Sequence, residues 1–390
     1  MPVSSPVDLV VSLGQPIVAV VLGGNRLVEL QNNDGGWDWP LDDGDPNSGS
    51  DPERFASVAM GLAKAYGKTS DPNMLAALQK AKTFLLSKTY NFEGTDGALA
   101  VELDSILGGT DCVDYVSTNF YDKLEAGTYY DARSDAVHDT NSYVQALRDR
   151  HTGSSANLAA WDLGVGLYSA YIIGANTTDW LAGLKAEIDE LDGTGWYDVL
   201  GLAGAVFGLA AVGEDYDPQA GYHEAASSLS DLAETLSGYQ LETGGFTWHS
   251  STMEPNSDEM MRETVYAVLA LNEFDRAGYL TQISDADIYL QTVQLVTGGW
   301  ENYPGSDYEE NSITGEVLRG IAVAISVLGD FDKDGNVNFV DFAIFASAWL
   351  TEPGEAKWNP ECDISDLSHD IIDEFDLAEF TKHWLEVIIP

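Results

Sequence analysis

The sequence is poor in basic residues. Its 390 residues include 18 Lys and Arg but 64 Asp and Glu, which gives a net charge of −46 at pH 7. A surface this acidic repels nucleic acids and anionic membranes, and no basic patch appears along the chain. We therefore expect neither a nucleic-acid partner nor binding to a membrane surface.

Cysteine and long apolar runs are also scarce. Cys112 and Cys362 are the two cysteines, and they lie far apart in the sequence, so a disulfide framework is not expected. The apolar stretch near the N-terminus is interrupted by Gln15 and Pro16 and is too short to span a membrane. It has no Lys or Arg before Arg26, whereas a secretory signal begins with a basic region. We expect this stretch to form the first helix of the fold.

The chain does contain an internal repeat. Each full copy consists of Gln, three residues, Gly-Gly and a large aromatic residue, and the full copies occupy residues 31–37, 240–246 and 294–300. Weaker copies occur at residues 91–98 and 192–198, and residues 149–157 fit an eroded copy. The spacing gives a set of six units about 50 residues long, which is typical of a repeat architecture.

Each unit predicts two helices, one on either side of the glycine pair. The first helix has one apolar stripe and a charged face, as in residues 71–88. The second is apolar almost all round, as in residues 199–213, so it must be buried on every side. The second helices are expected at residues 53–67, 98–107, 157–174, 198–213, 257–274 and 311–328. The simplest packing is an all-α (α/α)6 toroid, with an inner ring of apolar helices inside an outer ring of amphipathic ones.

The repeat, the apolar second helices and the period together resemble the terpenoid cyclase and protein prenyltransferase superfamily of toroids. The similarity covers roughly residues 16–328. It implies a fold rather than a reaction, because such toroids include cyclases, transferases, polysaccharide lyases and non-catalytic binders. The chain lacks the Asp-x-Asp-Asp acid of squalene-type cyclases, and Cys112 lacks the spacing of the prenyltransferase zinc ligands. A terpene cyclase is therefore the disfavoured alternative.

Acidic, aromatic loops follow the aromatic residue of the full copies, at residues 36–55, 245–263 and 299–316. Because every unit runs in the same direction, we expect these loops to meet at one end of the toroid. Aromatic rings stack on sugars, and paired carboxylates carry out acid–base chemistry on glycosidic bonds. We therefore expect a polysaccharide ligand. The candidate ligand-binding residues are Trp37, Trp39, Trp248, His249, Asp258, Glu259, Arg262, Trp300 and Tyr303.

Several of these candidates also fit a structural role. The first aromatic residue of each copy can fill the gap between helices. Asp258 and Glu259 precede a predicted helix, where carboxylates stabilise the helix dipole. His138 and Asp139 form another candidate pair of base and orienting group, but an isolated surface pair is more often incidental. The catalytic residues are unassigned, and the sequence leaves open a glycoside hydrolase, a lyase and a non-catalytic binding or adhesion protein.

The C-terminal region begins with the pattern of a calcium-binding loop. Residues 330–341 place oxygen ligands at loop positions 1, 3, 5, 7, 9 and 12, with Gly335 at position 6 for the sharp turn. Four carboxylates this close repel one another unless a cation lies between them. The expected calcium ligands are Asp330, Asp332, Asp334, Asn336 through its backbone carbonyl, Asn338 and Asp341.

A second loop–helix copy follows the first. Aligning Trp384 with Trp349 matches the helix of residues 376–385 to that of residues 341–350. The second loop is two residues longer and lacks the glycine, so a weaker or rearranged site is expected. Its expected ligands are Asp363, Ser365, Asp373 and Asp376.

Two calcium loops that are each followed by a single helix resemble a type I dockerin, and the resemblance covers residues 329–386. It implies that calcium folds the module. It also implies docking to a cohesin-like or cell-surface protein through loop positions 10 and 11, and an extracellular setting in polysaccharide breakdown. We therefore expect two domains, a toroid over residues 1–328 and a dockerin-like calcium-binding domain over residues 329–390.

Overall fold

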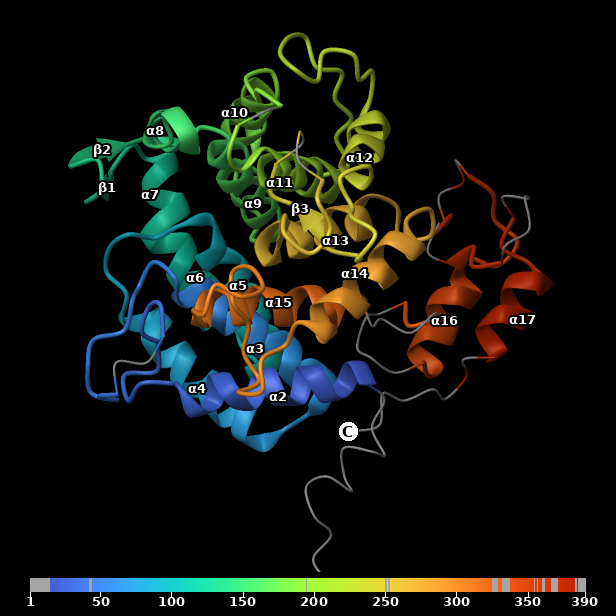
Figure 1. Cartoon of the computed structure of the whole chain (residues 1–390), viewed down its shortest axis with the longest axis horizontal. Helices are drawn as coiled ribbons and strands as arrows, with labels where there is room; N and C mark the ends of the chain where they lie inside the picture. The colour runs from blue at the N-terminus through green and yellow to red at the C-terminus, as the bar shows by residue number, and fades with distance from the viewer. Residues whose placement is uncertain are drawn as a thin grey trace, which may run out of the picture.

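The computed structural model shows a mostly helical chain (Figure 1). It describes residues 15–41, 44–193, 195–249, 251, 253–324, 329–331, 337–353, 355, 357–359, 362–365, 371–382 and 384. Within these residues, no helix is long and apolar enough to cross a membrane.

Six inner helices form a closed ring. They are α3 (Phe55–Thr69), α5 (Gly94–Leu107), α9 (Leu158–Ile172), α11 (Asp198–Ala211), α13 (Met261–Asp275) and α15 (Asn311–Ala324). Each packs against the next in this order, and α15 packs against α3, which closes the ring. Every one overlaps a predicted inner helix, so the sequence-based expectation of an (α/α)6 toroid is confirmed.

Glycine pairs bring neighbouring inner helices into close contact. A Cβ atom at Gly61 in α3 would overlap the carbonyl oxygen of Gly315 in α15. A Cβ atom at Gly164 in α9 would likewise overlap the carbonyl oxygen of Gly204 in α11. The Ala- and Gly-rich composition of these helices therefore sets how tightly the ring closes.

The outer helices are α2 (Gln15–Glu29), α4 (Pro72–Ser87), α8 (Thr140–Arg150), α10 (Thr178–Ile188), α12 (Leu229–Ser237) and α14 (Leu280–Thr292). Five of these six outer helices pack between two inner ones, and α8 packs against the inner helix α9 and the outer helix α10. For example, α2 contacts both α15 and α3, and α14 contacts both α13 and α15. The two-layer arrangement is the one that the apolar stripes of these helices predict.

An insertion in the third unit explains its irregular spacing. Between α5 and α8 the chain forms α6 (Asp111–Val116), the π-helical turn η1 (Ser117–Tyr121) and α7 (Asp122–Glu125). A hairpin of β1 (Tyr129–Asp131) and β2 (Ala136–His138) follows, with Tyr129 paired to His138. The extra elements lie outside α5 and α9, so the inner ring is uninterrupted.

In the three full copies of the repeat, the Gln residue connects its unit to the next. The side-chain amide of Gln31 donates to the carbonyl oxygen of Gly35 in its own turn and to that of Ala77 in α4, both at 2.9 Å. Gln294 makes the same pair of bonds, and its second acceptor is the carbonyl oxygen of Ala19 in α2, at 3.0 Å. The last unit is thus hydrogen-bonded to the first.

The glycine pair and the aromatic residue of the repeat complete this turn. Gly35 and Gly298 both have φ +97°, a conformation that strains any residue with a side chain. The indole nitrogens of Trp37 and Trp300 each donate to the carbonyl oxygen ten residues earlier, at 2.8 and 2.7 Å. The repeat motif is therefore a structural device that links the two helix layers.

The C-terminal region has its own core. Its helices α16 (Phe339–Ser347) and α17 (Glu374–Lys382) lie beside each other, apart from the ring in Figure 1. The buried apolar residues form two separate clusters, one within residues 19–321 and one within residues 331–380. The domain boundary at residue 328 fits between them and stays a prediction, because residues 325–328 lie outside the described part of the chain.

Candidate functional site

The loops that precede the inner helices are joined into a rim at one end of the toroid. The backbone N–H of Met261, at the start of α13, donates to the carbonyl oxygen of Asn302 at 2.9 Å. That of Asn311, at the start of α15, donates to the carbonyl oxygen of Pro40 at 2.8 Å. The three acidic aromatic loops therefore meet as predicted. The rim consists of residues 37–54, 90–91, 192–197, 246–260 and 300–310, as far as the structure describes them.

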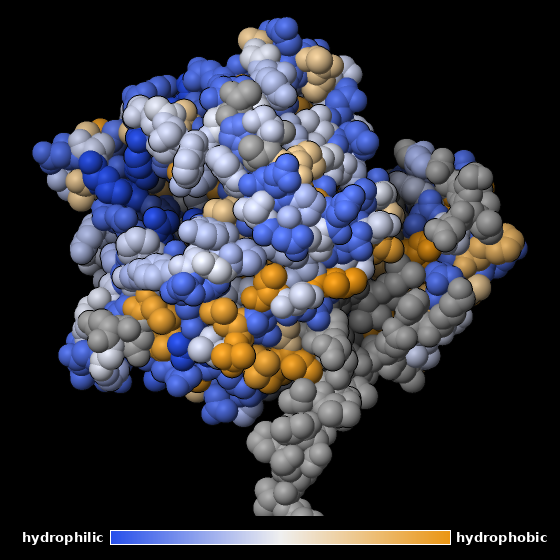
Figure 2. Space-filling view, viewed as in Figure 1, coloured by the Kyte–Doolittle hydropathy of each residue, from blue (hydrophilic) through white to orange (hydrophobic). Residues whose placement is uncertain are grey.

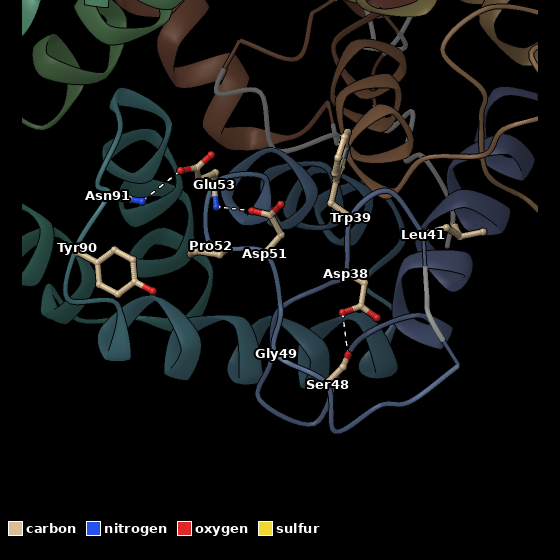
Figure 3. A pocket seen from close by; sticks show the side chains of 10 residues that line it. All are labelled: Asp38, Trp39, Leu41, Ser48, Gly49, Asp51, Pro52, Glu53, Tyr90 and Asn91. Carbon is tan, nitrogen blue, oxygen red and sulfur yellow. Dashed lines mark hydrogen bonds between the residues drawn. The ribbon is translucent and has the colours of Figure 1, made fainter. Parts of the chain in front are cut away.

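A cavity of about 540 Å³ opens in the first of these loops (Figure 3). The ring of Trp39 is 50% exposed there, and the guanidinium of Arg54 lies 5.7 Å from its centroid. In the view of Figure 3, the carboxyl groups of Asp51 and Glu53 lie between Trp39 and the ring of Tyr90. The lining residues are Asp38, Trp39, Leu41, Ser48, Gly49, Asp51, Pro52, Glu53, Tyr90 and Asn91.

Hydrogen bonds hold this cavity in shape. Asp51 Oδ1 accepts from the backbone N–H of Glu53 at 2.7 Å, and Glu53 Oε1 accepts from the side-chain amide of Asn91 at 3.1 Å. On the other side, Asp38 Oδ1 accepts from the hydroxyl of Ser48 at 3.0 Å. An exposed indole beside fixed carboxylates is suited to a sugar, whose C–H face stacks on a ring and whose hydroxyl groups donate to oxygen acceptors.

Trp248 lies on a neighbouring part of the rim. The hairpin of β3 (Phe246–Thr247) and β4 (Glu259–Met260) carries it, and its indole nitrogen donates to Asp258 Oδ1 at 3.3 Å. Its ring centroid lies 4.9 Å from that of His249 and 5.1 Å from that of Trp196. Four predicted site residues, Trp39, Trp248, His249 and Asp258, therefore lie on the rim, and Tyr303 is 47% exposed in the next loop.

The structure corrects the assignment of Trp37 and Trp300 to the ligand site. Their rings are 1% and 0% exposed, because they fill the space between the helix layers. Glu259 is also buried and accepts hydrogen bonds from Thr243 Oγ1 at 2.6 Å and from the backbone N–H of Asn256 at 2.7 Å. These three residues build the loops rather than face a ligand.

Arg262 lies inside the ring, below the rim. Its side chain forms an ion pair with Glu316 of α15 at 2.8 Å and lies 5.9 Å from the centroid of Trp161 in α9. The neighbouring Glu263 is 2% exposed, and burial raises the pKa of its carboxyl group to about 7. Trp161, Glu263 and Glu316 were not predicted from the sequence, because Arg262 brings together side chains of helices that are far apart in the chain.

His138 and Asp139 do not act as a pair. His138 is buried, and its Nε2 atom lies 2.7 Å from the hydroxyl of Ser134. Asp139 caps the N-terminus of α8. Its carboxyl group accepts from the hydroxyl of Ser142 at 2.6 Å and from the backbone N–H of Ser142 at 2.8 Å, and these two bonds lower its pKa. The candidate base and orienting group therefore have separate structural partners.

A different histidine contacts a carboxylate. His151 Nε2 lies 2.7 Å from Asp162 Oδ2, and His151 lines a second cavity of about 350 Å³ with Arg148, Asn157 and Glu187 among its neighbours. No local spacing in the sequence signals this contact, because one residue follows α8 and the other lies in α9.

The two loop–helix units of the C-terminal region are structural copies. Asp341 Oδ1 accepts from the backbone N–H of Phe331 at 2.6 Å, and its Oδ2 from that of Asn338 at 2.8 Å. Asp376 makes the corresponding bonds to Ile364 at 2.9 Å and to Asp373 at 2.9 Å. The core rings Phe345 and Phe380, each four residues after that aspartate, stack at 5.4 Å. The alignment of Asp376 with Asp341 is thus confirmed.

The residues that the structure describes in these loops fit a cation site in part. Asp341 and Asp376 are fully buried and turn their carboxyl groups back into their loops, and the buried hydroxyl oxygen of Ser365 has no hydrogen-bond partner among the described residues. Asp330, Asp363, Asn338 and Asp373 lie at the same ends of the two loops, whereas Asp332, Asp334 and Asn336 are outside the described residues. Within those residues, no group of three or more His, Cys, Asp or Glu side chains is arranged to hold a metal.

No protein-family model matches this chain, and no curated protein is significantly similar to it. Solved structures with a similar shape include a type II terpene cyclase from Scytonema (15% identity, TM-score 0.47, 80% of this chain and 97% of that one). Others are a polysaccharide lyase (13%, 0.46, 78% and 96%) and an unsaturated glucuronyl hydrolase from Streptococcus agalactiae (11%, 0.49, 80% and 91%). These likenesses concern overall shape and leave the ligand to be inferred from this chain's own residues.

Proposed function

We propose that this protein is an extracellular toroid that binds a polysaccharide at its rim and is attached to a partner through a calcium-binding, dockerin-like module. The observation that carries the polysaccharide proposal is the half-exposed Trp39 ring in the cavity lined by Asp38, Asp51 and Glu53. The exposed indole face beside fixed carboxylate acceptors is the combination on which a sugar ring can stack and hydrogen-bond.

The test is a binding screen of the full chain against soluble polysaccharides, with Trp39→Ala as the variant. Tyr171→Ala is a matched control, because Tyr171 is a similarly exposed ring at the C-terminal end of α9, whereas the rim lies at the N-terminal ends of the inner helices. We expect wild type and the control to bind alike and Trp39→Ala to bind about tenfold more weakly, as for an interfacial Trp. Equal binding by all three proteins would contradict the proposal.

A hydrolytic activity is the second candidate function. Glu263, with its pKa raised to about 7, and Glu316, paired with Arg262, are two carboxylates in different electrostatic environments below the rim. A protonated acid beside an ionised carboxylate is the combination that glycoside hydrolases use. Release of reducing oligosaccharides by wild type but not by Glu263→Gln would support an enzyme. Unsaturated ends on the released chains would indicate a lyase. Binding without any product would indicate a carrier. The terpene cyclase alternative lacks its acidic motif.

The calcium proposal is supported by the duplicated geometry of the two loops. Calcium would be held by the carboxylates and the Asn338 side chain of the first loop and, more weakly, by Asp363, Ser365, Asp373 and Asp376 of the second. Extracellular modules bind calcium with dissociation constants of about 10⁻⁴–10⁻³ M, which fits a protein outside the cell. The exposed rings of Phe339 and Phe375 lie at the positions expected to contact a cohesin-like or cell-surface protein.

Calorimetric titration of the full chain with calcium tests this part. We expect two sites, of which Asp341→Ala removes the tighter and Asp376→Ala the weaker. Asp285→Ala, on the exposed face of α14, is the control and should leave both sites intact. A wild-type protein that shows no calcium binding at millimolar concentration would refute the dockerin-like assignment.

A further inference from the structure

We propose that the ligand is an extended, uncharged polysaccharide chain, which lies along the rim between the Trp39 cavity and a second aromatic subsite formed by Trp196 and Trp248. This inference rests on the proposed polysaccharide-binding function and adds to it the length, the charge and the path of the ligand. Trp196 is the new residue, since its place in a degenerate repeat predicts a buried anchor rather than a binding residue.

The second subsite is an exposed and well-supported aromatic surface. Trp196 is 57% exposed, the highest exposure of any tryptophan in the described residues, and its ring meets that of Trp248 at 54°. The carbonyl oxygen of Trp196 accepts from the side-chain amide of Asn157 at 3.1 Å, and Asp258 accepts from the Trp248 indole. The first bond fixes the backbone of Trp196 and the second fixes the Trp248 ring against which Trp196 packs, so sugar rings can bind this surface at little entropic cost.

Two further rings lie between the subsites. Tyr303 and Tyr308 are 47% and 48% exposed on the 300–310 loop, which contacts the start of α13 on one side. On the other side, the residue after this loop, Asn311, donates to the carbonyl oxygens of Asp38 and Pro40. Exposed rings therefore occur on successive loops from Trp196 to Trp39.

The geometry of the ring requires a long ligand. Trp196 lies just before α11, whereas the backbone on either side of Trp39 is hydrogen-bonded to Asn311 at the start of α15, and α13 lies between α11 and α15 in the ring. With neighbouring helix axes about 8–10 Å apart, the axes of α11 and α15 in such a ring are about 14–17 Å apart. A single sugar ring cannot contact both subsites, whereas an oligosaccharide of several units can.

The charge of the rim selects against acidic sugars. Residues 37–54, 246–260 and 300–310 contain six, three and four acidic residues, and Arg54 is the only Lys or Arg in these stretches of the sequence. The guanidinium of Arg54 rests on the ring of Trp39. A uronic acid polymer would meet like charges, while the hydroxyl groups of neutral sugars find carboxylate acceptors.

The experiment is calorimetric titration of the full chain with neutral hexasaccharides (cellohexaose, xylohexaose, mannohexaose and laminarihexaose) and with the matching disaccharides. Hexagalacturonate is the charged probe. We expect one neutral hexasaccharide to bind about tenfold or more tightly than its disaccharide, and Trp196→Ala to remove most of that difference. Tyr171→Ala should change neither value.

The outcomes separate this inference from the proposed function. If Trp39→Ala weakens binding but the hexasaccharide binds no better than the disaccharide and Trp196→Ala has no effect, the extended path is wrong while the glycan site stands. Tighter binding of hexagalacturonate than of every neutral probe would overturn the charge argument. If no glycan binds, or if binding is independent of Trp39, the proposed function itself fails.

Discussion

Trp300 and Trp196 follow the glycines of two copies of the same repeat, yet one is fully buried and the other is the most exposed tryptophan described. In the sixth unit the motif is complete, and Trp300 fills the space between the helix layers and hydrogen-bonds to Leu290. In the fourth unit the Gln is absent and Trp196 points away from the core. The intact motif therefore places its aromatic residue in the core, and where the motif is incomplete the aromatic residue can lie on the surface.

The rim also differs from the rest of the visible surface in the kinds of residue that it combines. Hydrophilic residues dominate the face shown in Figure 2, and hydrophobic residues gather in its lower half, over α2. The rim differs from the hydrophilic area and from the hydrophobic area, because exposed rings and carboxylates alternate there within single loops. The combination, rather than acidity or hydrophobicity alone, is what supports a carbohydrate ligand.

The largest expected effect separates the two tryptophans by stability. Trp300→Ala removes a fully buried indole and should lower the free energy of unfolding by about 3–5 kcal/mol. Trp196→Ala removes an exposed ring and should change it by about 0.5 kcal/mol or less. Urea denaturation followed by circular dichroism measures both, and equal losses would show that Trp196 is a structural anchor after all.

A smaller effect, about 3 kcal/mol in the free energy of unfolding, is expected from the ionisation of the buried Glu263 carboxyl group. This prediction compares an interior carboxylate with one on the rim. Its pKa is raised to about 7 in the folded protein, so the folded state retains a proton that the unfolded state loses. Stability should therefore fall as pH rises from about 4.5 to about 7, and Glu263→Gln should remove that part of the pH dependence. The matched rim variant Glu301→Gln should retain the wild-type pH profile of the unfolding free energy; identical profiles for all three proteins would contradict the buried, protonated carboxyl group.

The next prediction concerns Gln294, the Gln of the complete repeat motif in the sixth unit. Its amide donates to Gly298 and, across the closure of the ring, to Ala19. Gln294→Ala should cost about 1–3 kcal/mol, because two backbone acceptors lose their partner. Gln145→Ala, at an exposed position of α8, is the control in the same denaturation assay. A loss no greater than that of the control would mean that the Gln of the repeat does not hold the ring closed.

The smallest expected effect is the loss of hexasaccharide affinity on removal of the exposed Tyr303 ring. Tyr303→Ala should leave the melting temperature unchanged and weaken hexasaccharide binding less than Trp39→Ala does, because a Tyr between two subsites offers a smaller contact area. Tyr308→Ala is the matched variant on the same loop. A loss of affinity larger than that of Trp39→Ala would move the centre of the binding site to the 300–310 loop.

The helical repeat, the six inner helices and the meeting of the loops were predictable, because they depend on hydrophobic periodicity and on a motif that recurs along the chain. The burial of Trp37 and Trp300 was not, since an aromatic residue after Gly-Gly fits a ligand and a core equally well. The contacts of His151 with Asp162 and of Arg262 with Glu316 were also hidden, because they join separate elements. In the C-terminal region, the match of Asp376 to Asp341 was predictable from the spacing to the tryptophans Trp384 and Trp349.

The decisive experiment compares the binding of a neutral polysaccharide by the double variant Trp39→Ala/Trp196→Ala and by wild type. Both rings are exposed, so the double variant should have the melting temperature of wild type. We expect this folded protein to bind the polysaccharide about a hundredfold or more weakly, because the two contributions combine. A double variant that binds the polysaccharide as tightly as wild type would contradict the assignment of the rim as the ligand site.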